Sequence, residues 1–527
     1  MIAVMARSYL PVDREQPFLL PPDMREWLPA RHLVWFVLDV VRRVDTAVLH
    51  RQHPNDGAGR RAYDPDMLLA LLLYAYCTGQ RSSRQIERLC EVDVAYRVLC
   101  ANHCPDHTTI ARFRQAHEQL AVALFIDALE LCAYVGLATV GVIAVDGTKM
   151  AADASLNANR TRASIEEEVR RMFGEAAAVD AEQDTLFGRT RGDELPAELT
   201  DPTSRAARLD RALAQLRRGD AERETTHAQR AAKEAEAAAR GQRVRGRRPD
   251  DTDPVADAET RLTLAQQRAK DRRAAIEARA AAEGRRVPGT PPGDGPRVGK
   301  ARQRLAAARQ AAEQADQAAN QSGDDDDHPP RPRANVTDPD SRTMKTANGW
   351  VQGFNAQAAV NEHGVVVACD VTQDHNDVRQ CQPMMTAIQA SLDAAGIDDP
   401  VDLLLFDAGY WSDDNATTEG PDRLIATTKT HRQRAAARAL GTTSGPPPPD
   451  ATPREAMEHR LRTVEGVTLY AKRSTTIEPV FGQHKHDRGW RRFLRRGLTA
   501  AKAEWHLMNT AHNLLKAFHH QHHTAPA

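Results

Sequence analysis

The sequence predicts an α/β protein that combines a mixed sheet, an all-α amino-terminal domain and a helical insertion. Three observations support this prediction. Helical periodicity extends from about residue 25 to residue 135. Beyond it, short apolar runs typical of buried strands alternate with helical patterns in the order β-β-β-α-β-α-β-α, which favours an α/β core with a mixed sheet. Residues 165–334 are rich in Ala, Arg, Glu and Gln, and they interrupt this core.

The length and the charge of the chain limit its class. At 527 residues the chain is longer than one hydrophobic core usually supports, so we expect several domains. The formal net charge is only -1, but positive charge gathers near the carboxyl end. Between Lys472 and Arg496, eight Lys or Arg residues accompany only two acids, Glu478 and Asp487. Such a segment indicates a surface that faces a polyanion.

The cysteines and the apolar runs indicate a cytoplasmic protein. The seven cysteines form no CxxC pair, and their scatter favours buried, reduced thiols over a disulfide framework. The amino-terminal stretch MIAVMARSYLPVDREQPF does not have the pattern of a secretory signal. The longest apolar stretch, LLALLLYAYC, is about half as long as a membrane-spanning helix.

Residues 1–135 are predicted to form the helical domain. Polar start signals precede its helices, namely Asp64-Pro65-Asp66, Ser82-Ser83 with Gln85 as a capping box, Asp93, and Asp106 or Thr108. The last signal opens one long amphipathic helix with Arg112 and Arg114 in its early turns. Short helices and tight turns are typical of a helix-turn-helix bundle, so both arginines are candidate DNA contacts. A purely structural bundle is the alternative.

The α/β domain begins at residues 136–164 and is then interrupted. The apolar run 140–145 predicts a buried strand, with Asp146 at its carboxyl end. The insertion 165–334 predicts a helical hairpin with a thin apolar seam and with loops at GRRVPGTPPGDGPR and DDDDHPPRPR. We expect it either to hold two DNA ends or two subunits together, or to be an inert solvated spacer.

Residues 335–430 are predicted to continue the α/β domain. Two strands, GWVQGFNAQAAV and GVVVACDVTQ, flank a hairpin turn at 361–364, and a helix follows at 377–396. The next buried strand ends at Asp407, and DRLIATTK is the last strand. The remaining predicted segments are a Pro-rich insertion at 431–464, the last part of the domain at 465–517, and a His-rich tail at 518–527 that resembles a metal-binding tract by composition alone.

Three acids, Asp146, Asp407 and Glu478, form the candidate catalytic and metal-binding set. In open α/β sheets ligands gather at the carboxyl ends of strands, where Asp146 and Asp407 would face one another if their strands are neighbours. Clustered carboxylates repel unless a cation neutralises them, and hard oxygen ligands suit Mg²⁺. Two such ions would activate a nucleophile and stabilise the leaving oxygen of a phosphodiester. A single Asp after a strand is otherwise a common turn residue.

The third acid is predicted to lie near a helix start. Proline is tolerated only in the first helical turn, so Pro479 places the helix start at Thr475 or Thr476 and Glu478 close to the helix N–H groups, which would keep it ionised. Lys485, two turns on, is a candidate phosphate ligand. Beyond it, the arginines predicted to track the DNA backbone are Arg488, Arg491 and Arg492.

Taken together, these stretches resemble a DDE transposase of a bacterial insertion sequence, with an RNase H-like catalytic domain and an amino-terminal helical domain. The matching stretches are RAYDPDMLLALLLYAYCTGQRSSRQIE, PDHTTIARFR, VDGTKMAADAS, DPDSRTMK, GFNAQAAV, FDAGYW and YAKRSTTIEPVFGQHK. The resemblance implies Asp146, Asp407 and Glu478 as the catalytic acids, two Mg²⁺ ions that Mn²⁺ may replace, and Lys485 as the lysine that follows the glutamate. Related transposases place a tyrosine and an arginine seven and four residues before the glutamate, whereas Tyr470 and Arg473 stand eight and five before it here. Arg473 is therefore either a phosphate ligand or an ordinary surface arginine.

The resemblance also implies a function and partners. The protein would bind double-stranded DNA at transposon inverted repeats, cleave it, and join the freed 3'-hydroxyl to target DNA, as a homodimer or higher homo-oligomer in the cytoplasm, on the bacterial nucleoid. A DNA nuclease or resolvase of the same fold, without strand transfer, is one alternative. A domesticated, non-catalytic DNA-binding protein is another.

A few further residues have two interpretations each. Trp411, together with Tyr410, either stacks on an unpaired base or packs the edge of the sheet. Four polar residues are either neighbours of the active site or members of a solvated loop: Lys149, Asp338, Arg342 and Lys345.

Overall fold

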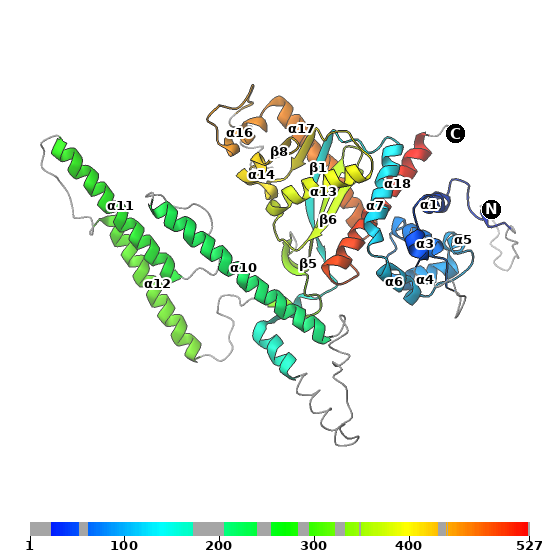
Figure 1. Cartoon of the computed structure of the whole chain (residues 1–527), viewed down its shortest axis with the longest axis horizontal. Coiled ribbons are helices and arrows are strands. Elements are labelled where there is room, and N and C mark those ends of the chain that lie inside the picture. Colours follow the sequence, from blue (N-terminus) through cyan, green and yellow to red (C-terminus); the bar gives the residue numbers. More distant parts are fainter. Residues whose placement is uncertain are drawn as a thin grey trace, which may run out of the picture. The chain divides into compact units, whose positions relative to one another are not determined.

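The structure is a computed structural model that describes residues 23–51, 62–171, 205–239, 254–282, 295–321, 333–346, 349–429, 439 and 441–524. The chain divides into two compact units (Figure 1). The first unit contains Met1–Ala158 and Asp340–Ala527, and the second contains Asn159–Pro339. No helix in the described ranges has the length and hydropathy that crossing a membrane requires.

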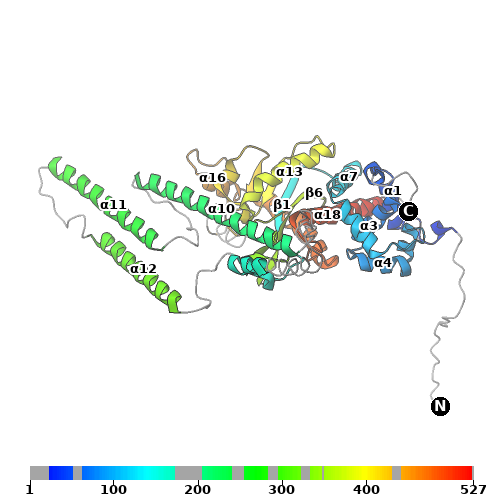
Figure 2. The same cartoon turned by 60° about the horizontal axis from the view of Figure 1, so that its bottom comes forward.

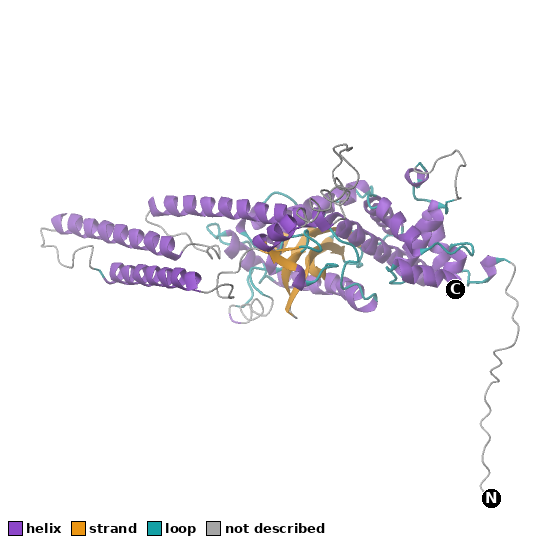
Figure 3. Cartoon of the chain, turned by 90° about the horizontal axis from the view of Figure 1, so that it is seen from below, coloured by secondary structure: helices purple, strands orange, loops and turns teal. Residues whose placement is uncertain are grey.

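The first unit contains a six-stranded mixed sheet, which confirms the predicted sheet type. Its strands are β1 (Val142–Ala151), β4 (Arg342–Thr346), β5 (Gly349–Asn361), β6 (Val366–Thr372), β7 (Leu403–Phe406) and β8 (Arg423–Ile425). The order β4-β5-β1-β7-β8 holds along one path, and β6 also pairs with β5. β1 is antiparallel to β5 and parallel to β7, and β7 is parallel to β8. Figure 3 shows the strands in orange, with helices around the sheet.

The hairpin between β5 and β6 forms where the sequence predicts it. Gly364 has φ +74°, a left-handed conformation that glycine adopts without strain. Asn361 Oδ1 accepts hydrogen bonds from the backbone N–H groups of His363 and Val365. The Asn361 amide donates to the carbonyls of Leu137 and Thr139, so the turn is also fixed to the start of β1. One side chain thereby sets the register of the two strands.

Each face of the sheet is covered by helices. Alternate residues of β1 point to opposite faces. Ile143 and Val145 share a buried cluster with α13 (Cys381–Ala394), whereas Val142 and Ala144 share the other cluster with α17 (Val464–Gly482) and α18 (Leu498–Thr524). Because both faces are buried, the central strands are continuous apolar runs rather than alternating ones.

The amino-terminal region is all-α, as predicted. Its helices are α1 (Leu33–Val41), α2 (Ala47–His50), α3 (Pro65–Cys77), α4 (Ser83–Val92), α5 (Val94–Leu99), α6 (His107–Ala116) and α7 (Leu120–Tyr134). The side chains of Asp64, Asp93 and Asp106 accept hydrogen bonds from the first-turn N–H groups of α3, α5 and α6, so three predicted caps are confirmed. Ser82 precedes α4 as expected but its side chain makes no cap bond, so the predicted capping box is wrong.

The single long helix predicted after Asp106 is also wrong, because the chain breaks at His117 into α6 and α7. The two helices bury different surfaces. Ile110 of α6 packs within the amino-terminal bundle near α4, while the apolar stripe of α7 packs along α18 (Figure 1). A straight helix could not present its apolar side chains to both partners.

A buried ion pair joins the amino-terminal helices to α18. Arg81 Nη1 lies 2.6 Å from Glu504 Oε1, with side-chain exposures of 7% and 0%. Arg81 also donates to the carbonyl of Arg492, and Glu504 Oε2 accepts from the N–H of Leu494. The segment that follows residue 488 thus lies between the helical region and the sheet, where Phe493 N donates to Ala151 O.

The predicted start of the Glu478 helix is wrong. α17 begins at Val464, capped by Thr463, and Pro479 lies inside it near its carboxyl end. Proline removes one backbone hydrogen bond, but Pro479 and Thr475, whose carbonyl loses that partner, are both exposed, so water can satisfy the group. A π-helical turn, Gln483–Asp487, follows directly.

Two buried histidines lie side by side, His484 of this turn and His512 of α18. His484 and His512 have ring centroids 5.2 Å apart, and His484 also contacts the rings of Trp490 and Trp505. Burial, followed by the charge of Arg488, lowers the pKa of His484 to about 3. Burial, followed by His484, lowers the pKa of His512 well below its usual value. Both rings are therefore neutral in the folded protein near neutral pH.

The free energy of unfolding is expected to fall as the pH drops below about 6.5. In that range both histidines become protonated in the unfolded chain but stay neutral in the folded protein. Their joint contribution should be about 2 to 3 kcal/mol lower at pH 5.5 than at pH 7.5. Urea unfolding followed by tryptophan fluorescence measures it, since all six tryptophans lie in the first unit. In a His484→Phe variant the free energy of unfolding should change about half as much between pH 7.5 and pH 5.5. The variant His363→Asn, on the exposed hairpin turn, should show the wild-type change. An equal slope in wild type and His484→Phe would contradict the assignment.

The second unit is mostly helical, as predicted. It contains the two-stranded sheet of β2 (Asn159–Thr161) and β3 (Arg333–Asn335), and the helices α10 (Arg205–Ala239), α11 (Pro254–Ala282) and α12 (Pro296–Gln321). The predicted leucine seam of α10 is buried within the unit, where Leu209 and Leu216 pack with Ile165 and Ala334. Figure 2 shows α11 beside α12, and Arg309 of α12 lies 2.8 Å from Glu259 of α11. Almost all of the two predicted loops lies outside the described residues.

Candidate active site

Two of the predicted acids lie side by side on neighbouring strands. β1 and β7 are parallel, with Val145 opposite Phe406, and Asp146 and Asp407 are the next residues of each chain segment. Asp407 follows β7 and accepts a hydrogen bond from the N–H of Gly409 at 2.7 Å. The sequence predicts that this strand ends at Asp146, but β1 continues along β5 to Ala151. Asp146 thus lies where the pairing with β7 stops and the pairing with β5 goes on.

α17 brings Arg473 and Glu478 to these acids. Arg473 Nη1 lies 2.9 Å from Asp146 Oδ2, and Arg473 Nη2 lies 3.8 Å from Glu478 Oε1. The Arg473 side chain is 11% exposed, whereas that of Glu478 is 62% exposed. One turn earlier on α17, Tyr470 Oη donates to the carbonyl of Phe406, the residue before Asp407. The structure therefore brings all three acids to one region, with a guanidinium between two of them.

The electrostatics of the two aspartates are those of crowded, partly buried carboxylates. Burial, followed by the charge of Asp407, raises the pKa of Asp146 to about 6, while Arg473 and the Gly147 N–H oppose the rise. Burial raises the pKa of Asp407, against the hydrogen bond from Gly409 and the charge of Arg473. A bound cation would favour the ionised form of both carboxylates and so oppose the rise in their pKa values.

Two lysines lie close to the acids. Lys485, in the π-helical turn, donates to Thr148 Oγ1 and to the carbonyl of Lys149 at 3.1 Å. Lys149 Nζ lies 3.7 Å from Asp377 Oδ1. Burial lowers the pKa of both lysines, and nearby carboxylates oppose the effect, Asp146 for Lys485 and Asp377 foremost for Lys149. Of the two predicted positions for Lys149, a neighbour of the active site or a member of a solvated loop, the contact with Asp377 favours the first.

The structure adds a residue that the sequence did not single out, Asp377. Its Oδ1 accepts hydrogen bonds from Asn355 Nδ2 at 2.6 Å and Gln357 Nε2 at 2.8 Å. It begins the 3-10 turn Asp377–Gln380 that precedes α13. An Asp at this position is an ordinary helix-start signal, so the sequence alone gave no reason to separate it from a cap.

The arginines predicted to contact DNA differ in exposure. Arg112, Arg491 and Arg492 are exposed. Arg491 Nε donates to the carbonyl of Lys485 and is thus held close to the lysine, whereas Arg492 pairs with Asp153. Arg488 instead points inward, with its guanidinium 5.2 Å from the ring centroid of Trp490. Arg114 donates to the carbonyl of Arg81 and lies within the helical region.

The remaining candidate residues differ in burial and in their place in the fold. Tyr410 is fully buried, its hydroxyl bonded to Gln357 Oε1, so it packs the sheet rather than stacking on a base. Trp411 is half-buried, and the Arg454 guanidinium lies 5.0 Å from its ring centroid. Arg342 and Lys345, predicted as neighbours of the active site or members of a solvated loop, lie in the strand β4. Asp338 belongs to the second unit.

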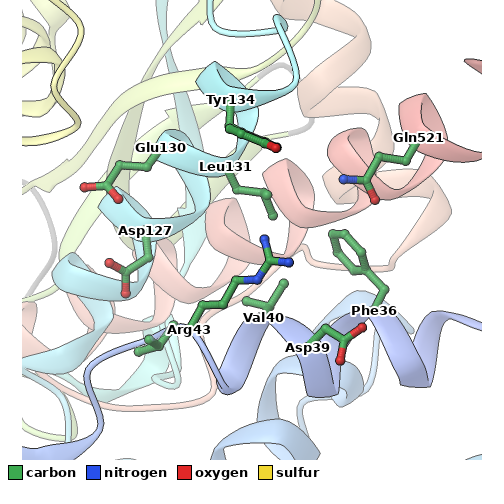
Figure 4. A pocket seen from close by; sticks show the side chains of 10 residues that line it. Phe36, Asp39, Val40, Arg43, Asp127, Glu130, Leu131, Tyr134 and Gln521 are labelled. Atoms are coloured by element: carbon green, nitrogen blue, oxygen red, sulfur yellow. The ribbon is translucent and has the colours of Figure 1, made fainter.

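A pocket of about 300 Å³ lies elsewhere on the first unit (Figure 4). Side chains of α1, α7 and α18 line it, among them Phe36, Asp127 and Tyr134, together with Arg43, which follows α1. α7 ends at Tyr134, just before the chain enters β1, whereas Asp146 lies further along that strand. None of the predicted acids lines this pocket, so it is not part of the candidate active site.

The donor set at the acids is suited to a divalent cation. Carboxylate oxygens are the ligands that Mg²⁺ prefers, and a bound cation would oppose the effect of burial, which raises the pKa of Asp146 and of Asp407. Among the described residues, no three His, Cys, Asp or Glu side chains are already arranged around one metal position. At the site itself the guanidinium of Arg473 lies between Asp146 and Glu478.

Comparison with known proteins bears on both ends of the chain. Residues 22–116 match the family model described as Transposase domain (DUF772), and residues 448–518 match the model described as Transposase DDE domain. No curated protein and no solved structure matches the chain. The first match covers most of the amino-terminal helices, and the second covers α17 with Arg473 and Glu478. The two matches together support a DDE-type transposase of an insertion sequence.

Proposed function

We propose that this protein cleaves DNA at the ends of an insertion sequence and joins the freed 3'-hydroxyl to target DNA. The observation that supports this best is the parallel pairing of β1 with β7, which puts Asp146 beside Asp407 on the face that α17 covers with Arg473 and Glu478. The strand order β6-β5-β1-β7-β8, with three antiparallel strands followed by two parallel ones, supports an RNase H-like catalytic domain.

In this proposal the three acids hold two Mg²⁺ ions, for which Mn²⁺ may substitute. The ions would lower the pKa of an attacking water and neutralise the charge on the leaving oxygen. Asp146 and Asp407 would position the scissile phosphate through the ions that they hold, and Arg473 would leave Asp146 to bind a phosphate oxygen. In the first step water attacks phosphorus and the 3'-oxygen leaves. In the second step that 3'-hydroxyl loses its proton and attacks a phosphorus atom of the target DNA. The bond from this phosphorus to the target's own 3'-oxygen breaks, and that oxygen takes up a proton as it leaves.

The proposed DNA path begins at Lys485 and continues over the exposed arginines. Arg491 and Arg492 lie directly beyond the π-helical turn, and their segment packs against the helical region that contains Arg112. Exposed arginines bind phosphates without sequence preference and would place the duplex across the acids. Trp411, half-buried near Asp407, is a further candidate contact for an unpaired base.

Metal removal and strand transfer test the proposed function. Purified protein should nick a duplex that contains the element's inverted repeat in Mg²⁺ or Mn²⁺, and EDTA should abolish nicking. A pre-cleaved end with a free 3'-hydroxyl should then become covalently joined to a supercoiled plasmid. Cleavage without joining would favour the nuclease alternative, and binding without either reaction would favour a domesticated DNA-binding protein.

We further propose that the second unit holds two transposon ends or two subunits together and takes no part in the chemistry. Its α11 and α12 contain 11 Lys or Arg residues against 6 Asp or Glu, so the pair is net positive. Its two chain ends form β2 and β3, which pair with Thr161 opposite Arg333. The unit therefore begins and ends at one place, like a hairpin loop.

Removal of residues 162–332, with Thr161 joined to Arg333 by an Asn-Gly turn, should leave the sheet folded, because the paired strands already bring these residues together. The shortened protein should still nick a single end in Mg²⁺ but should not form paired-end complexes in a native gel. A matched variant that replaces only residues 240–321 with a Gly/Ser linker keeps the α10 core and tests α11 and α12 alone. Normal pairing by the 162–332 deletion would show that the unit is a spacer.

A further inference from the structure

Lys149 is a cation that several carboxylates attract at once. It lies on β1 opposite Asn355, and its side chain is 18% exposed. Among the described residues its Nζ has no hydrogen-bond acceptor, and its nearest charged partner is Asp377, 3.7 Å away. The charges of Asp146 and Asp407 also act on it. If its flexible side chain turned away from Asp377, the charges of Asp146 and Asp407 would still attract the ammonium.

Asp377 is fixed more firmly than the lysine. Asn355 and Gln357, both fully buried on β5, donate hydrogen bonds to its Oδ1. A Cβ atom on Gly147 would lie 2.5 Å from Asp377 Oδ1 and 2.3 Å from Gln357 Nε2, so this close approach requires a glycine directly after Asp146. A Cβ on Gly409 would lie 3.3 Å from Asp377 Oδ2. Asp377 is thus held against the backbone beside both catalytic strand positions.

The positions of these charges imply a competition. A divalent cation and the Lys149 ammonium are both attracted to Asp146 and Asp407, and an ammonium paired with these carboxylates would have to be displaced before metal could bind. Asp377, on the face of the sheet that α13 covers, offers the ammonium a carboxylate that is not shared with the metal.

We propose that Asp377 is a positioning residue that keeps Lys149 away from Asp146 and Asp407, so that the catalytic carboxylates stay available to divalent cations. This inference rests on the proposed metal-dependent function. It concerns metal affinity, and not a direct contact of Asp377 with DNA or with the reacting atoms.

The test is a calorimetric titration of the full chain with Mn²⁺ in the absence of DNA. Asp377→Asn should weaken Mn²⁺ binding by about tenfold, because Lys149 then pairs with Asp146 or Asp407. Lys149→Gln should bind Mn²⁺ at least as tightly as wild type. The double variant should bind like Lys149→Gln, which means that removal of the lysine rescues the loss of Asp377. Asp374→Asn, which removes an equal charge three residues away, should leave the affinity unchanged.

Other outcomes would overturn the proposal in distinguishable ways. Unchanged affinity in Asp377→Asn would show that Lys149 does not compete. A double variant as weak as Asp377→Asn would show that Asp377 is itself a metal ligand. Failure of the wild type to bind Mn²⁺ would remove the metal from the proposed function as well. Circular dichroism checks that each variant folds. If Asp377→Asn does not fold, the double variant Asp377→Ser with Lys149→Gln replaces it, and this variant should bind Mn²⁺ like Lys149→Gln. Weaker binding by that double variant would contradict the proposal.

Discussion

Replacement of Asp146 or Asp407 by asparagine is expected to lower the rate of DNA cleavage by about 1000-fold or more. Asparagine keeps the shape of the side chain but removes the negative charge that would bind Mg²⁺. A 1000-fold loss corresponds to about 4 kcal/mol of transition-state stabilisation. Single-turnover cleavage of a labelled transposon end in Mg²⁺ measures the loss. DNA binding, followed by gel shift, should stay near the wild-type level because the arginines and Lys485 that would bind phosphate remain.

Asp402→Asn is the matched control for this experiment. Asp402 is exposed and lies just before the first residue of β7, whereas Asp407 follows the last residue of the same strand. Its replacement changes the net charge equally but leaves the acids untouched, so cleavage should be normal. Glu478→Gln should behave like the two aspartate variants. Cleavage at the wild-type rate by Asp146→Asn or Asp407→Asn would exclude that residue from the chemistry.

Glu504→Leu is expected to destabilise the first unit by about 3 to 5 kcal/mol. The change leaves the Arg81 guanidinium buried without its counter-ion and leaves the N–H of Leu494 without its acceptor. This is a large part of the stability of a typical domain. Urea unfolding at pH 7.5, followed by tryptophan fluorescence, measures the loss. The double variant Arg81→Met with Glu504→Leu should recover much of it, because an apolar pair of similar volume carries no desolvation cost.

Lys502→Gln provides the surface comparison on the same helix. Lys502 Nζ lies 2.7 Å from Asp370 Oδ1, but the two side chains are 40% and 36% exposed. Exposed pairs contribute about 0 to 1 kcal/mol, so this variant should unfold close to wild type. If Glu504→Leu were no less stable than Lys502→Gln, the buried pair could not be what joins the helical region to α18.

The sequence predicted the parts of the fold that local patterns specify. The continuous apolar runs that form β1 and β7, the turn at Gly364 and the caps at Asp64, Asp93 and Asp106 each have a local physical cause. It also placed an acid after each of two buried runs, although only the sheet order shows that the runs are neighbours. The roles of these acids stay predictions.

The errors arose where tertiary contacts override local rules. Pro479 is an ordinary first-turn signal, but the exposed side of α17 lets water take the place of the missing hydrogen bond. Arg488 reads as one more basic residue of the DNA-facing stretch, yet the indole of Trp490 draws it inward. The importance of Asp377 depends on Asn355 and Gln357 from another strand, and no local pattern contains that information.

The pairing of Thr161 with Arg333 has a consequence for the length of the segment between them. The second unit begins and ends at one short antiparallel ladder, so it is connected to the α/β core in the way that a hairpin loop is connected to its two strands. Because the cost of closing a loop grows slowly with its length, we expect the sheet to tolerate a shorter, longer or different segment at this position. The same ladder is a natural attachment point for a fluorescent reporter or an affinity module, which could be inserted between Thr161 and Arg333 in place of the native helices.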